Sequence, residues 1–192
     1  MLLASMLQQA AMCELSYTLN VSYQSWNCTG GSPPTQPVTD LCSWLGVTCN
    51  DVGAVVQLAI PPQNYDSSIP ISTLTKLTSL QVLNVEYGNF KGKVQSAISK
   101  LVNLRKLYLD NNALTGSVPS VLCSLPALII IDVRSNHFRC YPYCILVSGT
   151  ALVADNQLAL CPGATEHRPP PLCKFTHILN VTSSCYDTSF LK

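Results

Sequence analysis

The residues best suited to chemistry in this 192-residue chain are its ten cysteines. Four thiolates could bind a zinc ion, and the candidate ligands are Cys140, Cys144, Cys161 and Cys173. Their spacing lacks the paired C-x2-C segments of structural zinc sites. Ten cysteines are also unusual in a reducing compartment. The cysteines therefore favour disulfides outside the cell, and we predict no metal site.

The chain carries no recognisable catalytic constellation. It has three histidines and none of the G-x-S-x-G, H-E-x-x-H or phosphate-loop motifs. His137 is expected at the edge of a binding face. Its ten acidic residues are scattered, and the repeat described below would bring together only Glu86, Asp110 and Asp132. We predict no catalytic residue, no cofactor and no enzymatic activity.

Composition places the chain outside the cell. With 11 Lys+Arg against 10 Asp+Glu the formal net charge is +1, which removes the usual electrostatic reason to expect a nucleic-acid partner. Charged residues make up 11% of the chain, well below the roughly 25% of a typical domain, so solubility must come from uncharged groups or sugar. Three Asn-x-Ser/Thr sequons fit that expectation and are predicted glycosylation sites: Asn20, Asn27 and Asn180.

The charge is uneven along the chain. Residues 1–75 contain four acids and no Lys or Arg, whereas residues 76–139 contain eight basic and three acidic residues. An acidic N-terminal part thus precedes a basic segment, and this asymmetry is where we expect a partner to bind.

The elements that position these residues follow a 24-residue period. Leu77, Leu101 and Leu125 are 24 residues apart, and the same spacing recurs at three further apolar positions of each unit. The middle unit has the pattern L-x-x-L-x-L-x-x-N-x-L, which is the leucine-rich repeat. Its L-x-L segment alternates inward and outward as a strand must. An irregular unit beginning at Val55 precedes the regular ones.

The Asn position of each unit normally hydrogen-bonds the backbone of neighbouring coils. Asn112 and Asn136 occupy it, whereas Gly88 and Gln63 do not match. We therefore expect a ladder of asparagines that is broken toward its N-terminal end.

Two motifs give the chain a family resemblance. The segment ahead of the repeats reads Cys42-Ser-Trp44-Leu-Gly46-Val47-Thr-Cys49. The segment that follows Asn112 reads Leu114-Thr-Gly116-Ser-Val118-Pro119. The chain resembles the plant-type extracellular leucine-rich repeat proteins, whose cap carries C-x-W-x-G-V-x-C and whose repeats continue L-x-G-x-I-P. Receptor ectodomains, cell-wall hydrolase inhibitors and protist surface antigens use this class of repeat.

The resemblance implies a fold. It is an α/β right-handed solenoid with a parallel concave β-sheet, 3₁₀ or irregular segments opposite, and disulfide-bonded caps at both ends. It also implies a Cys42–Cys49 disulfide, with Trp44 as a lid on the first coil. Cys13 and Cys28 could pair within the same cap. The other six cysteines allow 15 pairings, and none is preferred.

Three regions are expected along the chain: an N-terminal cap over 1–53, repeats over 54–139, and a Cys-rich C-terminal cap and tail over 140–192. Apolar residues at helical spacing, among them Leu2, Leu3, Met6 and Leu7, predict a helix near the start that covers the core. The chain contains no stretch of 18 apolar residues, which is about the length needed to span a membrane. We expect an export signal upstream of this chain, and an anchor could lie outside it.

The outward residues of successive strands should form columns on the concave face. One column is Gln57, Val82, Lys106 and Ile130, and the next is Ala59, Asn84, Tyr108 and Asp132. The polar and aromatic residues on this face form either a self-compensating charge cluster or a binding patch. The candidate ligand-binding residues are Asn84, Glu86, Tyr87, Arg105, Lys106, Tyr108, Asp110, Asp132 and Arg134.

Size limits what this face can bind. Four strands of about five residues give roughly 300 Å², whereas a standard protein interface needs about 800 Å² per partner. Either the caps contribute, or the ligand is small, or the chain is part of a larger array. We predict non-catalytic recognition of a protein or glycan ligand. The alternatives are a structural surface-coat glycoprotein and a secreted cell-wall hydrolase inhibitor.

Overall fold

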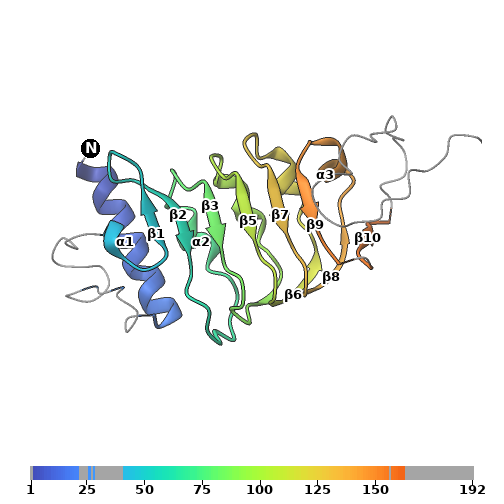
Figure 1. Ribbon diagram of the computed structural model, residues 1–192, viewed down its shortest axis with the longest axis horizontal. Coiled ribbons are helices and arrows are strands. Elements are labelled where there is room, and N and C mark those ends of the chain that lie inside the picture. The colour runs from blue at the N-terminus through green and yellow to red at the C-terminus, as the bar shows by residue number, and fades with distance from the viewer. Residues whose placement is uncertain (1, 22–25, 27, 29–40, 156, 163–192) are drawn as a thin grey trace, which may run out of the picture.

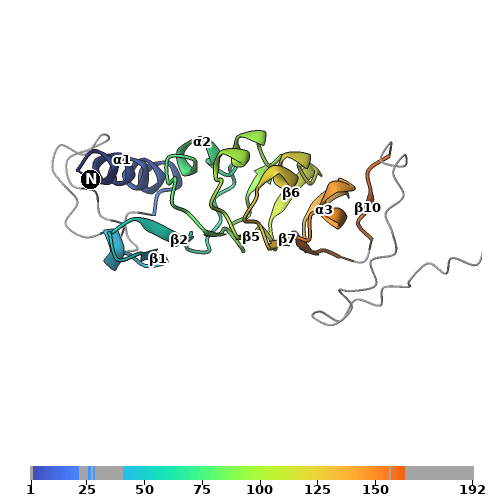
Figure 2. The same cartoon turned by 90° about the horizontal axis from the view of Figure 1, so that it is seen from above.

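The computed structural model describes residues 2–21, 26, 28, 41–155 and 157–162, which form a solenoid of stacked coils (Figure 1). Helices lie along one side and the strands of the main sheet along the other (Figure 2). The main sheet has six strands in the order β1-β2-β3-β5-β7-β9. Their bounds are Val47–Cys49, Val55–Ala59, Val82–Asn84, Lys106–Tyr108, Ile130–Asp132 and Ala151–Val153.

The register of the main sheet follows the repeat, with a spacing of 25 residues from β2 to β3 and of 24 residues from β3 through β7. Gln57, Val82, Lys106 and Ile130 are successive partners, and so are the residues two positions later on each strand. The predicted parallel solenoid is therefore confirmed, but its extent differs from the four five-residue strands expected. β1 folds back antiparallel to β2 and β9 adds a last parallel strand.

The strands after β2 are short because the chain turns directly beyond them. Tyr87, Asn111 and Ser135 all have positive φ, from 51° to 55°. Such left-handed backbone cannot continue a strand. Tyr87, expected on the sheet, therefore lies in the turn that follows it.

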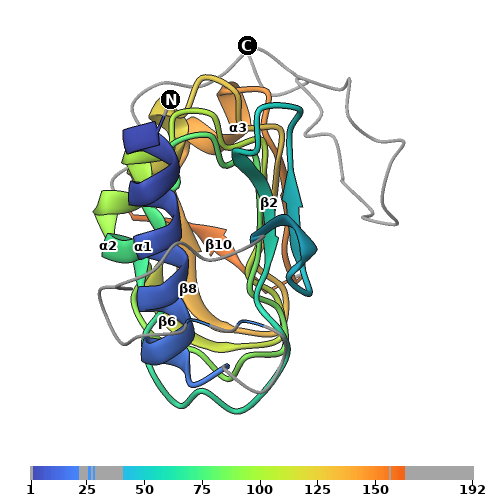
Figure 3. The same cartoon turned by 90° about the vertical axis from the view of Figure 1, so that its left-hand side faces the viewer.

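A second, four-stranded sheet was not expected from the sequence. It runs in the order β10-β8-β6-β4, with strands Ala159–Leu160, His137–Tyr141, Ala113–Ser117 and Lys91–Gly92. All of its pairings are parallel. Figure 3 looks along the solenoid and shows β6 and β8 on a different side of the core from β2. The expected 3₁₀ segments do form, at η3 (Ser96–Lys100) and η4 (Ser120–Ser124), next to the short helix α2 (Ile71–Leu74).

The repeated leucines make the core. The repeated leucines of two successive coils are at most 1% exposed: Leu77, Leu80, Leu83, Leu101, Leu104, Leu107 and Leu109. Each buried leucine contributes about 1.5–3 kcal/mol relative to an exposed one. Because every coil buries its leucines against its neighbours, the two end coils need covers.

The asparagine ladder is centred on Asn112. Its Oδ1 accepts hydrogen bonds from the backbone N–H groups of Gly88 and Phe90, and its Nδ2 donates to the carbonyl of Val85. Asn136 repeats the arrangement in the next coil, where its Oδ1 accepts from Leu114 N. Further toward the N-terminus the ladder gives way to the stacked rings of Tyr65 and Phe90, 4.8 Å apart.

The N-terminal cover is helix α1 (Leu2–Leu19). It is longer than the expected 1–12 helix because no residue interrupts it until Asn20, which has φ 52°. Its buried face is also different: Met6 and Leu7 are each 59% exposed, whereas Met12 and Leu15 are fully buried. Gln63, at a ladder position, instead donates from Nε2 to the Leu19 carbonyl and so ties the helix to the first coil.

Two stacked tryptophans complete this cap. The rings of Trp26 and Trp44 are 5.7 Å apart, both are buried, and Trp26 Nε1 donates to the Leu45 carbonyl. Disulfides join Cys42 to Cys49 and Cys13 to Cys28. The cap thus combines a small aromatic core with two covalent links.

The C-terminal cover uses two further disulfides, Cys123–Cys144 and Cys140–Cys161. The short helix α3 (Cys144–Val147) begins at one of these cysteines and precedes strand β9 in the chain. Cys173 and Cys185 lie outside the described residues. Within the described part of the chain, no helix is long and apolar enough to cross a membrane.

Candidate ligand-binding face

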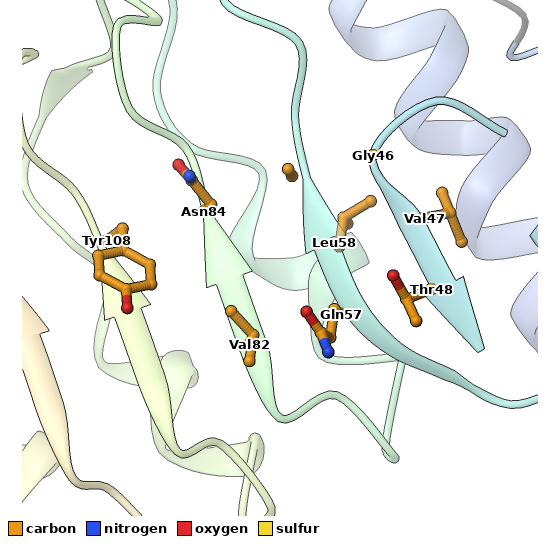
Figure 4. Close-up of a pocket in the computed structure, with 9 residues that line it drawn as sticks. Gly46, Val47, Thr48, Gln57, Leu58, Val82, Asn84 and Tyr108 are labelled. Atoms are coloured by element: carbon orange, nitrogen blue, oxygen red, sulfur yellow. The ribbon is translucent and has the colours of Figure 1, made fainter. Parts of the chain in front are cut away.

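The outer face of the main sheet is hollowed near its N-terminal end. Strands β1, β2, β3 and β5 enclose a depression of about 300 Å³, shown in Figure 4. Its lining is uncharged and mixes amide, hydroxyl, aromatic and aliphatic groups: Gly46, Val47, Thr48, Gln57, Leu58, Ala59, Val82, Asn84 and Tyr108.

Backbone register positions these side chains. Thr48, Gln57 and Val82 are partners on successive strands, so they form one row across the hollow. Asn84 and Tyr108 form the next row. Asn84 Oδ1 accepts a hydrogen bond from Glu86 N, which holds the amide in place. The hollow therefore presents fixed polar groups beside an aromatic ring.

Sequence reasoning missed three members of this lining, Gly46, Val47 and Thr48. The C-x-W-x-G-V-x-C segment was read as a cap only, and β1 is antiparallel and lies outside the 24-residue period. Gly46 has φ 80°, and a Cβ there would lie 2.1 Å from the Ala59 carbonyl oxygen. The alternating apolar and polar residues of Val47-Thr-Cys49 were the available signal for a strand.

Two predicted outward carboxylates are in fact buried. Asp110 and Asp132 are each 5% exposed. Arg134 was expected beside Asp110, but its guanidinium binds Asp132, with Nη2 to Oδ2 at 2.6 Å and Nε to Oδ1 at 3.0 Å. Because Arg134 folds over Asp132, the pair neutralises itself and covers the carboxylate.

Among the described residues, no cation forms an ion pair with Asp110. Burial raises the pKa of its carboxyl, and the charges of Asp132 and Glu86 raise the pKa further, while a hydrogen bond from Asn111 Nδ2 opposes them. Glu86 is half-buried on the adjacent coil. This part of the candidate face is therefore partly the self-compensating cluster considered above.

The remaining candidate residues are available to a ligand. Arg105 and Lys106 are exposed, and neither forms an ion pair with any described residue. Tyr87 is 59% exposed. Lys106 lies beside Val82 and on the same strand and face as Tyr108, so it borders the hollow. The candidate face thus combines the uncharged hollow with Lys106 beside it, and Arg105 is exposed one residue earlier in the chain.

The other predicted sites are placed as follows. Asn20 is exposed at the end of α1, whereas Asn27 and Asn180 lie outside the described residues. His137 is on β8 of the second sheet rather than at the edge of the main one. Among the described residues, no group of three or more His, Cys, Asp or Glu side chains could hold a metal ion.

Comparison with known proteins gives consistent similarities. The leucine rich repeat family model matches residues 78–138. Pollen receptor-like kinase 1 of Arabidopsis thaliana is 38% identical over 50% of this chain and 13% of its own length. Phytosulfokine receptor 1 of the same plant is 36% identical over 46% of this chain and 9% of its own. The chain therefore spans about a tenth of the length of these curated relatives.

Solved structures show the same architecture. The ectodomain of GASSHO1/SCHENGEN3 from Arabidopsis thaliana, in complex with CASPARIAN STRIP INTEGRITY FACTOR 2, matches with a TM-score of 0.57 at 25% identity, over 80% of this chain and 18% of that one. The BIR3–SERK2 complex of the same plant matches with a TM-score of 0.56 at 25% identity, over 74% and 78% of the two chains.

Proposed function

We propose that this chain, which resembles plant extracellular leucine-rich repeat proteins in sequence and in fold, binds an extended peptide on the outer face of its main sheet. It acts outside the cell or at its surface and has no catalytic activity of its own. The observation that carries this proposal is the hollow enclosed by β1, β2, β3 and β5, with Lys106 at its rim.

The dimensions of the sheet favour a peptide over a folded partner. Six strands about 4.8 Å apart are about 24 Å across, which is the length of about seven extended residues. With strands of about three residues, the area is still only roughly 240 Å², far below the about 800 Å² of a standard protein interface. A hydrolase inhibitor or a receptor for a globular partner would need more surface than this sheet provides.

The chemistry of the face suggests what the peptide carries. The hollow accepts one side chain, which stacks on Tyr108 and bonds the amides of Gln57 and Asn84. An acidic residue next to it would meet Lys106 and Arg105, both exposed. Solved structures of similar fold include the plant peptide hormone receptor RGFR1 in complex with RGF2, which supports a peptide ligand on this class of scaffold.

A neutral glycan is the second candidate. The uncharged lining of hydroxyl and amide groups beside a tyrosine ring is also suited to a sugar, because the ring offers an apolar face and the amides offer donors and acceptors.

Binding of the oxidised protein to arrays of peptides and neutral oligosaccharides tests both ligands. We expect a peptide hit whose dissociation constant rises about tenfold or more in Tyr108→Ala and in Lys106→Glu. Lys100→Glu, an exposed charge change on η3, serves as the control and should bind normally. If the peptide binds both Tyr108→Ala and Lys106→Glu as tightly as it binds the unchanged protein, the ligand does not bind this face. Binding to neutral sugars alone would favour the second candidate.

A further inference from the structure

The second sheet carries a charge of one sign. Strands β4, β6, β8 and β10 contain no acidic residue. The three acids of the basic segment 76–139 all lie in or directly after main-sheet strands instead, at Glu86, Asp110 and Asp132. The uneven charge of the sequence is thus a spatial separation between two faces.

Five exposed polar side chains on and directly beside the second sheet form what we call the cationic face, from which the exposed Lys91 of β4 is left out because it pairs with Asp66. It consists of Lys93, Thr115, Ser117, His137 and Arg139. All five are exposed, whereas Leu114 and Cys140 between them point inward and are buried. The face is therefore the solvent side of the sheet, and the register of β6 against β8 shifts between Gly116 and Ser117, so that Ser117 pairs with Cys140.

Register fixes the spacing of these groups. Gly92 pairs with Leu114, and Thr115 pairs with His137, so Lys93, Thr115 and His137 lie in one row across three strands. The outer two are about 10 Å apart, which is two strand spacings. A Cβ at Gly116 would lie 3.0 Å from Lys93 Cγ, so the lysine stem rests on β6 where the glycine leaves room.

The cations of this face have no internal counter-charge. Asp66 is the one described acid that forms an ion pair with a residue of this sheet, and its partner is Lys91 of β4. Neither Lys93 nor Arg139 forms an ion pair with any described residue. Two fixed cations with hydroxyls between them thus face solvent on a flat surface.

We propose that the cationic face binds an anionic polysaccharide that carries carboxylates along its length. A linear polyanion presents repeated charges that Lys93 and Arg139 can bind at once, and its hydroxyls can exchange hydrogen bonds with Thr115 and Ser117. The site is separate from the hollow of the main sheet, so one molecule can hold a polymer and leave its peptide face open.

An anionic membrane fits the face less well. Stable attachment to lipid surfaces uses clusters of about four to eight basic residues or an inserted apolar group. The cationic face has only two Lys or Arg residues, and the one large apolar side chain that is exposed on the described strands of this sheet is Leu160, on the edge strand β10. The polar surface is matched to a hydrated polymer instead.

The test compares binding of the oxidised protein to immobilised polygalacturonate, to neutral dextran and to vesicles containing phosphatidylserine. We expect binding to polygalacturonate alone, lost as NaCl rises from about 0.05 M to about 0.5 M because salt screens exposed charges. The double variant Lys93→Gln/Arg139→Gln should raise the dissociation constant about tenfold or more.

The matched control is Lys76→Gln/Lys100→Gln, which removes the same charge from two exposed residues away from the cationic face and from the proposed peptide site. If both double variants lose the same affinity for polygalacturonate, the effect depends only on net charge and the proposed site is wrong. Binding to vesicles but not to polygalacturonate, or no binding at low salt, would overturn the proposed ligand. Peptide binding by Lys93→Gln/Arg139→Gln should be unchanged, so the two proposals can fail separately.

Discussion

Asp110 and Asp132 show how two carboxylates in neighbouring coils can differ in their surroundings. Asp132 accepts the Arg134 guanidinium at 2.6 Å, whereas Asp110 receives a hydrogen bond only from the neutral amide of Asn111 among the side chains described around it. Burial without a cation disfavours the charged form. The ionised carboxylate of Asp110 therefore destabilises the folded state.

Replacing Asp110 with Asn should stabilise the protein at neutral pH. The folded pKa is raised above its ordinary value of 3.8, so the stability linked to this group is largest below that value and is lost as pH rises through the folded pKa. Asp110→Asn removes this loss, because a neutral amide can keep the bond to Asn111. Denaturant unfolding at about pH 4 and about pH 7 should show a gain that grows with pH.

Asp51→Asn is the control for net charge. Asp51 is exposed in the turn between β1 and β2. An equal gain in both variants, or a gain from Asp110→Asn that shrinks as pH rises, would contradict the role given to burial.

At the scale of elements, the antiparallel hairpin β1–β2 joins the N-terminal cap to the repeats. It carries the Cys42–Cys49 disulfide, one wall of the hollow and the close approach of Gly46 to Ala59. Ala59 N donates to the Gly46 carbonyl at 2.7 Å. The hairpin therefore both covers the core and lines the hollow of the main sheet.

Gly46→Ala should destabilise this hairpin strongly. A Cβ at this position would lie 2.1 Å from a backbone oxygen at φ 80°, so the strands must separate. Gly53→Ala in the same hairpin is the matched control, because φ is 76° but nothing lies within 4 Å. We expect about 1–2 kcal/mol from the control, for backbone strain alone, and clearly more from Gly46→Ala, measured by denaturant unfolding. Equal costs would mean that the strand contact is unimportant.

Hydrophobic period and backbone register explain what the sequence could predict at this scale. Leu83, Leu107 and Ile131 must point inward if the period is 24, and that alone fixes Tyr108 and Asn84 as outward neighbours. The second sheet escaped prediction because β4 has two residues and β6 contains Gly116, so neither shows an apolar alternation. Thr48 escaped because a hairpin from the cap has no period, and the burial of Asp110 and Asp132 depends on neighbours that residue type does not reveal.

At the scale of the whole molecule, stability is a sum of neighbouring coils closed by two caps. The C-terminal cap depends on Cys140–Cys161, which ties β8 to the residues after β10, and on Cys123–Cys144, which ties η4 to α3. Both close the same sequence separation of 21 residues. They are therefore a natural pair for comparing what each bond holds.

Removing Cys140–Cys161 by substitution of both residues with Ala should cost about 3 kcal/mol in the chain-entropy account of a 21-residue loop. Hydrogen exchange should rise in β8 and β10 first, while β2 and β3 keep their protection, because coils contact only their neighbours. Removing Cys123–Cys144 should cost a similar amount but expose η4 and α3. A uniform rise in exchange along the chain would contradict coil-by-coil stability.

Both tryptophans of the chain, Trp26 and Trp44, are stacked on each other in the N-terminal cap. Intrinsic fluorescence therefore monitors one end of the solenoid and is blind to the other. If the coils unfold one after another and the C-terminal coils unfold first, the melting curve from tryptophan fluorescence and the curve from far-ultraviolet circular dichroism should not coincide. Tryptophan fluorescence alone would then report whether the N-terminal cap is folded, and only the two signals together would report whether the whole protein is folded.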